Sequence, residues 1–178
     1  MRVWNGPGPA ANKSDDRAMD ITLDANPDPI GWRVWLTGHV RDPDGVGYDV
    51  ATISYIVWPF EQSPNPNEEL TPYLPTTTEK GVAVTANVRD VYVTASIQAD
   101  NTDLPQILTF KIESFGAYPN TYYDFDWMRL FGMAISDIPS AIIAPTRADE
   151  SVSVFVFGRS FLLPTSYDQV GVHYTEPP

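Results

Sequence analysis

The chain has 178 residues, no cysteine, a formal net charge of -12 and a sequence pI of about 4.3. The lack of cysteine excludes disulfides, thiolate nucleophiles and thiolate metal sites. The negative charge argues against nucleic acid as a partner, because such binding needs basic side chains. The length fits one domain that buries about 70% of its extended surface.

Two further classes of protein are disfavoured by the pattern of apolar residues. No apolar run approaches the roughly 20 residues that span a bilayer. The first residues, Met-Arg-Val-Trp-Asn-Gly, lack the apolar centre of a secretory signal. We therefore expect a soluble chain without an export signal.

Among the charged residues, Asp outnumbers Glu and Arg outnumbers Lys. The sequence contains 16 Asp and 7 Glu, but 3 Lys beside 8 Arg. Short, hydrated Asp in place of long Lys stems reduces exposed apolar area, and molar salt screens the repulsion among carboxylates within a few ångströms. This bias resembles that of proteins from extreme halophiles, and an ordinary acidic extracellular or phage protein is the alternative.

Alternating apolar and polar residues, rich in β-branched and aromatic types, predict strands along most of the chain. Residues 1–17 lack this period and predict a flexible N-terminal arm before a single domain over residues 18–178. The clearest strand places Val152, Val154 and Val156 on one side. The expected strands are residues 18–24, 32–40, 48–58, 82–88, 91–97, 107–114, 127–135 and 151–157, with 170–175 as a further edge strand.

Proline and aromatic residues mark the expected connections. Residues 41–47 predict the turn of a hairpin. Residues 61–78 carry four prolines, which exclude a helix or a central strand. A loop of that length is expected to be functional or docked through Leu70, Tyr73 and Leu74. Residues 116–126 predict an aromatic loop, and residues 137–140 and 144–146 frame the connection between the last two long strands.

The sequence pattern also predicts how two of the strands are buried. Residues 48–58 are almost continuously apolar or β-branched, so we expect burial on both faces. Residues 107–114 alternate between two faces, as a strand with one solvated face would. Ile107, Thr109, Lys111 and Glu113 share one face, opposite Leu108, Phe110 and Ile112.

The two histidines offer no recognisable site. His39 and His173 lie far apart in the sequence, no third zinc ligand is spaced to join them, and no Gly-x-Ser-x-Gly elbow is present. His39 falls on the polar face of its strand, where we expect it to be solvated. We therefore predict no catalytic residue.

Two groups of carboxylates have a chemical and a plainer interpretation. Asp42, Asp44 and Asp49 surround two glycines and crudely match a calcium loop, but the bidentate glutamate is missing and an ordinary turn is the alternative. Asp124 and Asp126 fit paired carboxylates for glycoside hydrolysis, or a solvated loop. We predict no cofactor and no metal site beyond this weak calcium candidate.

Aromatic residues make up 12% of the chain and gather in expected loops. Such residues can stack on sugar rings, anchor a protein interface or cap the sandwich. The interface candidates are Tyr73, Leu74, Tyr118, Tyr122, Tyr123 and Trp127.

The strand pattern predicts the fold class. No window sustains apolar residues at helical spacing for three turns, so no long helix is expected. Eight or nine strands joined by long, proline-rich connections favour an all-β, single eight-stranded jelly-roll β-sandwich or barrel over an up-and-down meander.

The last third of the chain carries a resemblance. Residues 127–164 contain a strand, a proline-bearing connection, Glu-Ser-Val-Ser-Val-Phe-Val-Phe-Gly at residues 150–158 and a proline soon after. This pattern resembles the closing strand pair of viral single jelly rolls, as in picorna-like capsid proteins. With its size, lack of cysteine and Asp-rich surface, the chain looks most like a small major capsid protein of the sphaerolipovirus group, the membrane-containing icosahedral viruses of haloarchaea.

The resemblance implies a structural protein of the virion that assembles a capsid shell and has no catalytic site. Its implied partners are copies of itself and a second single jelly-roll capsid protein, with an underlying viral membrane as a further contact. The alternative from the residues alone is a carbohydrate-binding β-sandwich module of a secreted or virion-surface protein, and an enzyme is the least favoured class.

Overall fold

The computed structural model describes residues 17–23, 32–41, 47–57, 66–70, 77–87, 90–99, 104–115, 122–132, 136–147, 150–163 and 166–176. These residues form eleven strands in three antiparallel sheets and contain no helix. The prediction of an all-β chain is confirmed. No helix in the described ranges is long and apolar enough to cross a membrane.

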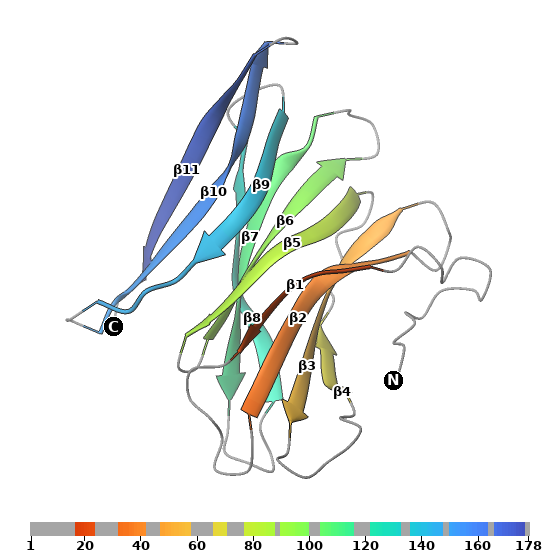
Figure 1. Ribbon diagram of the computed structural model, residues 1–178, viewed down its shortest axis with the longest axis vertical. Coiled ribbons are helices and arrows are strands. Elements are labelled where there is room, and N and C mark those ends of the chain that lie inside the picture. The colour runs from red at the N-terminus through yellow and green to blue at the C-terminus, as the bar shows by residue number, and fades with distance from the viewer. Residues whose placement is uncertain are drawn as a thin grey trace.

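The three sheets follow one another along the chain (Figure 1). The first contains β1 (Arg17–Leu23), β2 (Trp32–Arg41), β3 (Tyr48–Val57) and β4 (Pro66–Leu70). The second contains β5 (Thr77–Asn87), β6 (Asp90–Ala99), β7 (Gln106–Phe115) and β8 (Tyr122–Phe131). The third contains β9 (Ser136–Ile143), β10 (Val152–Leu163) and β11 (Ser166–Glu176).

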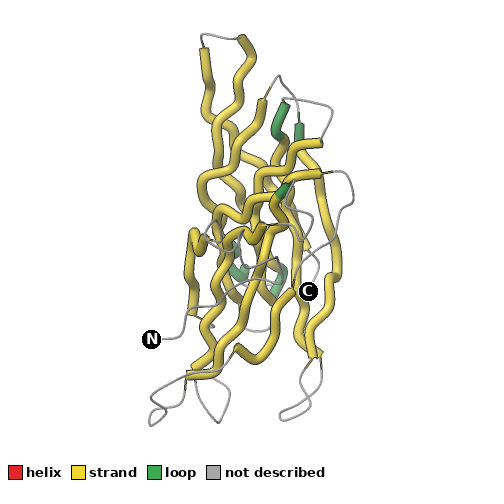
Figure 2. The backbone as a smooth tube through the Cα atoms, turned by 90° about the vertical axis from the view of Figure 1, so that its right-hand side faces the viewer, coloured by secondary structure: helices red, strands yellow, loops and turns green. Residues whose placement is uncertain are grey.

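Hydrogen-bonded neighbours in every sheet are consecutive along the chain. The strand orders are β1-β2-β3-β4, β5-β6-β7-β8 and β11-β10-β9. Our preference for crossing connections over an up-and-down arrangement is therefore wrong for the described strands. Figure 2 shows these strands running roughly along the long axis of the molecule.

Two segments that the sequence predicted as connections, residues 61–78 and 137–140, contain all or part of a strand. Pro66 lies in β4 and Pro139 in β9, and both strands are at a sheet edge, where a missing backbone donor is tolerated. The expected aromatic loop at 116–126 is also corrected, because Tyr122 begins β8 and the strand includes Asp126. The expected tail strand at 170–175 is confirmed as part of the edge strand β11.

The second sheet is central and separates two apolar cores. Val91 and Val93 of β6 belong to a core completed by Trp35 and Val50 of the first sheet. Tyr92, between them on the strand, belongs to a core with β9 and β10 of the third sheet. Because neighbouring residues of a strand point to opposite faces, the first and third sheets cover opposite faces of the central one.

A close backbone approach joins the first sheet to β5. A Cβ added at Gly81 would lie 2.4 Å from the Gly38 carbonyl oxygen and 2.6 Å from the Thr37 hydroxyl, so only glycine fits there. Nearby, a carboxylate oxygen of Asp20 accepts the backbone N–H of Val84 at 2.9 Å. This bond ties β1 to the edge strand β5.

Burial differs from expectation where a second sheet covers a polar face. Thr109 and Lys111 are buried rather than wet, because the face of β7 that carries them is turned toward the third sheet. His39 is also buried, and its ring lies edge-on to Tyr48 with centroids 5.2 Å apart. The prediction for β3 is confirmed, since every residue from Asp49 to Ser54 is buried.

Candidate functional site

A polar cluster of the central sheet is built on one row of three strands. Tyr92 on β6 pairs with Lys111 on β7, which pairs with Trp127 on β8. Residues paired across neighbouring strands share a face, and for this row it is the face toward the third sheet, where Tyr92 and Trp127 pack. The sheet register therefore brings a phenol, an ammonium group and an indole together.

A β-bulge adds a carboxylate to this row. Lys111 pairs with Trp127 and Ile112 pairs with Phe125, so Asp126 is the extra residue of β8. A bulge redirects the inserted side chain, and Asp126 reaches Lys111 with 3.0 Å between its carboxylate oxygen and the ammonium nitrogen. The loop interpretation of Asp126 is thus replaced by an ion pair within a strand.

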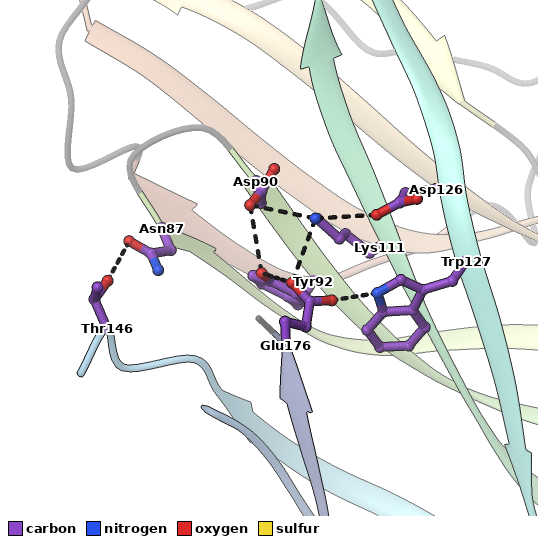
Figure 3. Close-up of polar contacts among 8 residues, drawn as sticks. All are labelled: Asn87, Asp90, Tyr92, Lys111, Asp126, Trp127, Thr146 and Glu176. Carbon is purple, nitrogen blue, oxygen red and sulfur yellow. Dashed lines mark hydrogen bonds and ion pairs between the residues drawn. The ribbon is translucent and has the colours of Figure 1, made fainter. Parts of the chain in front are cut away.

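Lys111 contacts two further carboxylates (Figure 3). Its nitrogen lies 3.5 Å from Asp90 of β6 and 3.3 Å from Glu176, the last residue of β11. Glu176 also accepts the Tyr92 hydroxyl at 2.8 Å and the indole N–H of Trp127. One carboxylate of the third sheet is thereby fixed to all three members of the row.

The environment holds Lys111 charged and Tyr92 neutral. Burial alone lowers the pKa of Lys111, but the hydrogen bond to Asp126 and the charges of Asp90 and Glu176 outweigh it and raise the pKa above its ordinary value. Burial, followed by the hydrogen bond to Glu176, raises the pKa of Tyr92. Burial also raises the pKa of Asp90, against the lowering effect of Lys111.

These pKa directions fit a fixed ion-pair network. A lysine that acts as a base or nucleophile needs a lowered pKa, and that of Lys111 moves the other way. The chemical capacity of the cluster is to hold the end of β11 against the central sheet. We call Asp90, Tyr92, Lys111, Asp126, Trp127 and Glu176 the Lys111 cluster.

A pocket of about 330 Å³ opens beside the Lys111 cluster. The Trp127 ring in its wall lies 5.6 Å from the Tyr174 ring, centroid to centroid, and 5.5 Å from the guanidinium carbon of Arg129. The lining residues are Lys111, Asp126, Trp127, Arg129, Tyr174, Thr175 and Glu176. The pocket therefore combines aromatic surface with both signs of charge.

The structure places few of the predicted interface residues at this pocket. Trp127 lines it, whereas Tyr73, Leu74 and Tyr118 lie outside the described residues. Tyr122 and Tyr123 are on β8 rather than in a loop, and only their backbone is described.

The predicted carboxylate sites are not assembled as expected. Asp42 and Asp44 fall outside the described residues, and Asp49 is buried on β3. No group of three or more His, Cys, Asp or Glu side chains within the described ranges could hold a metal ion. Asp124 accepts the backbone N–H of Phe125 and does not line the pocket that contains Asp126.

Sequence reasoning missed most of the Lys111 cluster. Lys111 carried a usable signal, because it interrupts a strongly apolar strand, and a buried lysine requires anionic partners. The identity of those partners had no local signal. Glu176 reaches Lys111 only because the third sheet folds back over the second, and Asp126 only through a bulge.

His173 also has a defined environment. Its ring stacks on Phe155 of β10, with centroids 4.5 Å apart and planes 6° from parallel. The face that carries this pair is the outer face of the third sheet, opposite the buried Val154 and Val156.

Comparison with known proteins adds no relative to this description: no family model, no curated protein and no solved structure matches the chain.

Proposed function

We propose that the chain is a structural capsid protein, a small major capsid protein that builds an icosahedral shell through contacts with copies of itself and with a second shell protein. The proposal joins the resemblance of residues 127–164 to viral capsid proteins with the arrangement of apolar side chains on the outer strands. The virion is the corresponding location.

The exposed apolar side chains of the two outer sheets carry the proposal. Ile21 and Leu23 of β1 are 62% and 49% exposed, and Ile143 of β9 and Phe157 of β10 are 49% and 46% exposed. Grouped apolar surface of this kind marks contact with another macromolecule. Because it lies on both outer sheets, one subunit can contact neighbours on two sides.

The role does not depend on the eight-stranded jelly roll that the resemblance implies. Consecutive pairing of the described strands does not support that topology. A stack of three sheets with exposed apolar side chains on both outer sheets offers surfaces for packing against neighbouring subunits.

The charge of the chain sets the condition for assembly. Copies with a net charge of -12 repel one another. Salt shortens the distance over which this repulsion acts, the Debye length, from about 8 Å at physiological ionic strength to about 3 Å at 1 M salt. Assembly is therefore expected at molar salt and is weakened by dilution of the salt.

Quantitative mass spectrometry of purified virions tests the function directly, because a shell protein is present at high copy number. In reconstitution at molar salt, replacing Ile21 and Leu23 by serine should abolish particle formation without lowering the melting temperature. Ala18→Ser, at another exposed site of β1, is the matched control. Absence from particles, or assembly indifferent to the double variant, would contradict the proposal.

The pocket beside Trp127 favours a carbohydrate-binding module as a second candidate function. Its volume of about 330 Å³ is at the small end of ligand pockets, and Arg129, Asp126 and Thr175 supply polar groups beside an aromatic ring. A glycan array at molar salt tests this function. Binding that is lost in Arg129→Gln and retained in Met128→Ala, a neighbour outside the pocket, would support it, and an array without binders would reject it.

A further inference from the structure

The three sheets end in six edge strands, and five of them carry features that hinder pairing with another chain. Unpaired backbone groups on an edge attract another strand unless proline, basic residues or bulges intervene. Proline occurs in β4 and β9. Arg17 in β1, Lys80 in β5 and Arg129 in β8 are basic, and the pairing of each of these three strands contains a bulge.

The sixth edge strand, β11, lacks proline and basic residues, and it has no inserted residue of its own. The one register shift in its pairing, between Phe161 and Leu163, inserts a residue of β10 at the hairpin end. The sequence of β11, Ser-Tyr-Asp-Gln-Val-Gly-Val-His-Tyr-Thr-Glu, has no proline, lysine or arginine. It pairs with β10 over ten consecutive residue pairs, from Val152↔Glu176 to Phe161↔Tyr167, without a register shift. None of the described strands pairs with its other edge, which lies at the border of the molecule (Figure 1).

We propose that β11 pairs antiparallel with β11 of a second copy of this chain, joining two third sheets into one continuous sheet of six strands around a twofold axis. The inference rests on the proposed assembly role and names one of its contacts. A twofold contact of this kind uses the same surface on both copies, so no further protein is needed to form it.

The sequence of β11 fixes the register. Full overlap of the eleven residues sets Gly171 opposite Gly171 of the second copy and pairs Val170 with Val172 on either side of the axis. These apolar cross-strand pairs are favourable, and directly opposed like charges are not. Asp168 then faces Tyr174 of the second copy.

Other registers are poorer for defined reasons. A shift by one residue would place side chains from the inner face of one copy opposite side chains from the outer face of the other copy. A shift that centres the pair on Val172 would set Asp168 directly opposite Glu176, and a shift toward Val170 shortens the overlap. Glu176 also keeps its partner Lys111 within its own subunit.

The length of β11 is sufficient for a defined contact. Eleven residues at about 3.4 Å each span about 37 Å. An antiparallel pair forms about one hydrogen bond for each opposed pair of residues, which gives about ten. Specific protein interfaces carry about ten direct hydrogen bonds, so the edge alone matches a typical interface in polar contacts.

Cysteine cross-linking at the axis tests the register. The native chain has no cysteine, and a Cβ at Gly171 meets no atom within 4 Å, so Gly171→Cys fits the single subunit. Opposed residues of an antiparallel pair have Cα atoms about 4.5–5.5 Å apart, within the range for a disulfide. Under oxidising conditions at molar salt, most of the Gly171→Cys protein should become a covalent dimer.

Gln169→Cys is the matched control. Its two copies would lie four residues apart along the strands, about 14 Å, which is too far for a disulfide. Dimers at position 171 and not at position 169 support the pairing. Equal cross-linking at both positions, or none at either, overturns it.

A second measurement does not depend on cysteine. Gly171→Lys opposes two like charges at the axis and should raise the dissociation constant of the dimer in sedimentation velocity, most strongly at the lowest salt at which the wild type is dimeric. Ala141→Lys, an exposed site on β9, should leave the dissociation constant unchanged. A wild-type monomer in molar salt overturns the pairing. If the wild-type protein is monomeric in molar salt but abundant in virions, the pairing is wrong and the assembly role stands. If it forms dimers that are absent from virions, the assembly role is wrong and the pairing stands.

Discussion

Replacing Lys111 by methionine removes the cation of the Lys111 cluster while keeping most of its apolar stem. The Lys111 and Glu176 side chains are 11% and 13% exposed, whereas Asp126 is 40% exposed. The variant therefore leaves two poorly solvated carboxylates, those of Asp90 and Glu176, without their partner. Asp126 can recover its hydration.

The expected loss follows from these exposures. Breaking a buried ion pair by removing one partner costs about 3–5 kcal/mol, and an exposed pair contributes about 0.2–1 kcal/mol. Because Asp90 and Glu176 keep slight contact with water, we expect the lower end, about 3 kcal/mol, in the free energy of unfolding. With a urea m-value of about 2 kcal/mol/M, the midpoint should fall by about 1.5 M.

Urea unfolding of Lys111→Met beside Lys80→Met measures this loss. Lys80 is exposed on β5, with its nitrogen 4.7 Å from the Tyr48 ring centroid, so the same change of charge there should cost less than about 1 kcal/mol. The deficit of Lys111→Met should persist at 1 M salt, because buried pairs are screened weakly. Equal midpoints for the two variants would refute the assigned role of Lys111.

The pH dependence of the deficit gives an independent check. Burial already raises the folded pKa of Asp90 above its ordinary value of 3.8, and loss of Lys111 raises it further. A carboxyl with a raised folded pKa destabilises the fold above that pKa and is relieved as it becomes protonated. The difference between Lys111→Met and wild type should therefore shrink as the pH falls through the folded pKa.

Three further outcomes are expected from unfolding experiments. Trp127→Phe removes the indole donor to Glu176 and should cost about 1.5–3 kcal/mol, as for other hydrogen bonds to charged groups. An unchanged urea midpoint would contradict this. Gly81→Ala would bring a Cβ within 2.4 Å of a carbonyl oxygen and should lower the free energy of unfolding by about 1–3 kcal/mol. Gly171→Ala should change it by less than about 0.5 kcal/mol, because a Cβ there meets no atom within 4 Å. Equal melting temperatures for these two variants would disprove the close approach at Gly81. In alkali, the contribution of Lys111 is complete below its ordinary pKa of 10.5 and is lost as the pH rises through the higher folded value, so wild type and Lys111→Met should converge there.

Local alternation was sufficient to predict most strands. Val152, Val154 and Val156 are buried on one face as their spacing predicts, and Asp49–Ser54 is buried throughout. Alternation reports which residues share a face, because the side-chain period of a strand is two. It does not report what covers that face. Thr109 and Lys111 have the pattern of a solvated face, and a third sheet packs there instead.

The candidate site was less predictable because its contacts depend on pairing register and on sheet packing. Asp126 meets Lys111 through one inserted residue, which the sequence of β8 does not reveal. Pro66 and Pro139 indicated connections, yet both occupy edge strands, where proline is compatible with pairing on one side. Each error has the same physical origin: the signal was local and the deciding contact was distant.

The Lys111 cluster meets, at Glu176, the edge of β11 with which no described strand pairs. This residue ends β11 and binds Tyr92, Lys111 and Trp127 of the central sheet. A strand held in this way is ordered before it meets a second copy, so less conformational entropy is lost on association. In the proposed six-stranded sheet, Glu176 lies opposite Ser166 of the other copy, and the cluster therefore fixes each outer end of the contact. If the proposed pairing forms, the Lys111 cluster orders the strand that makes it.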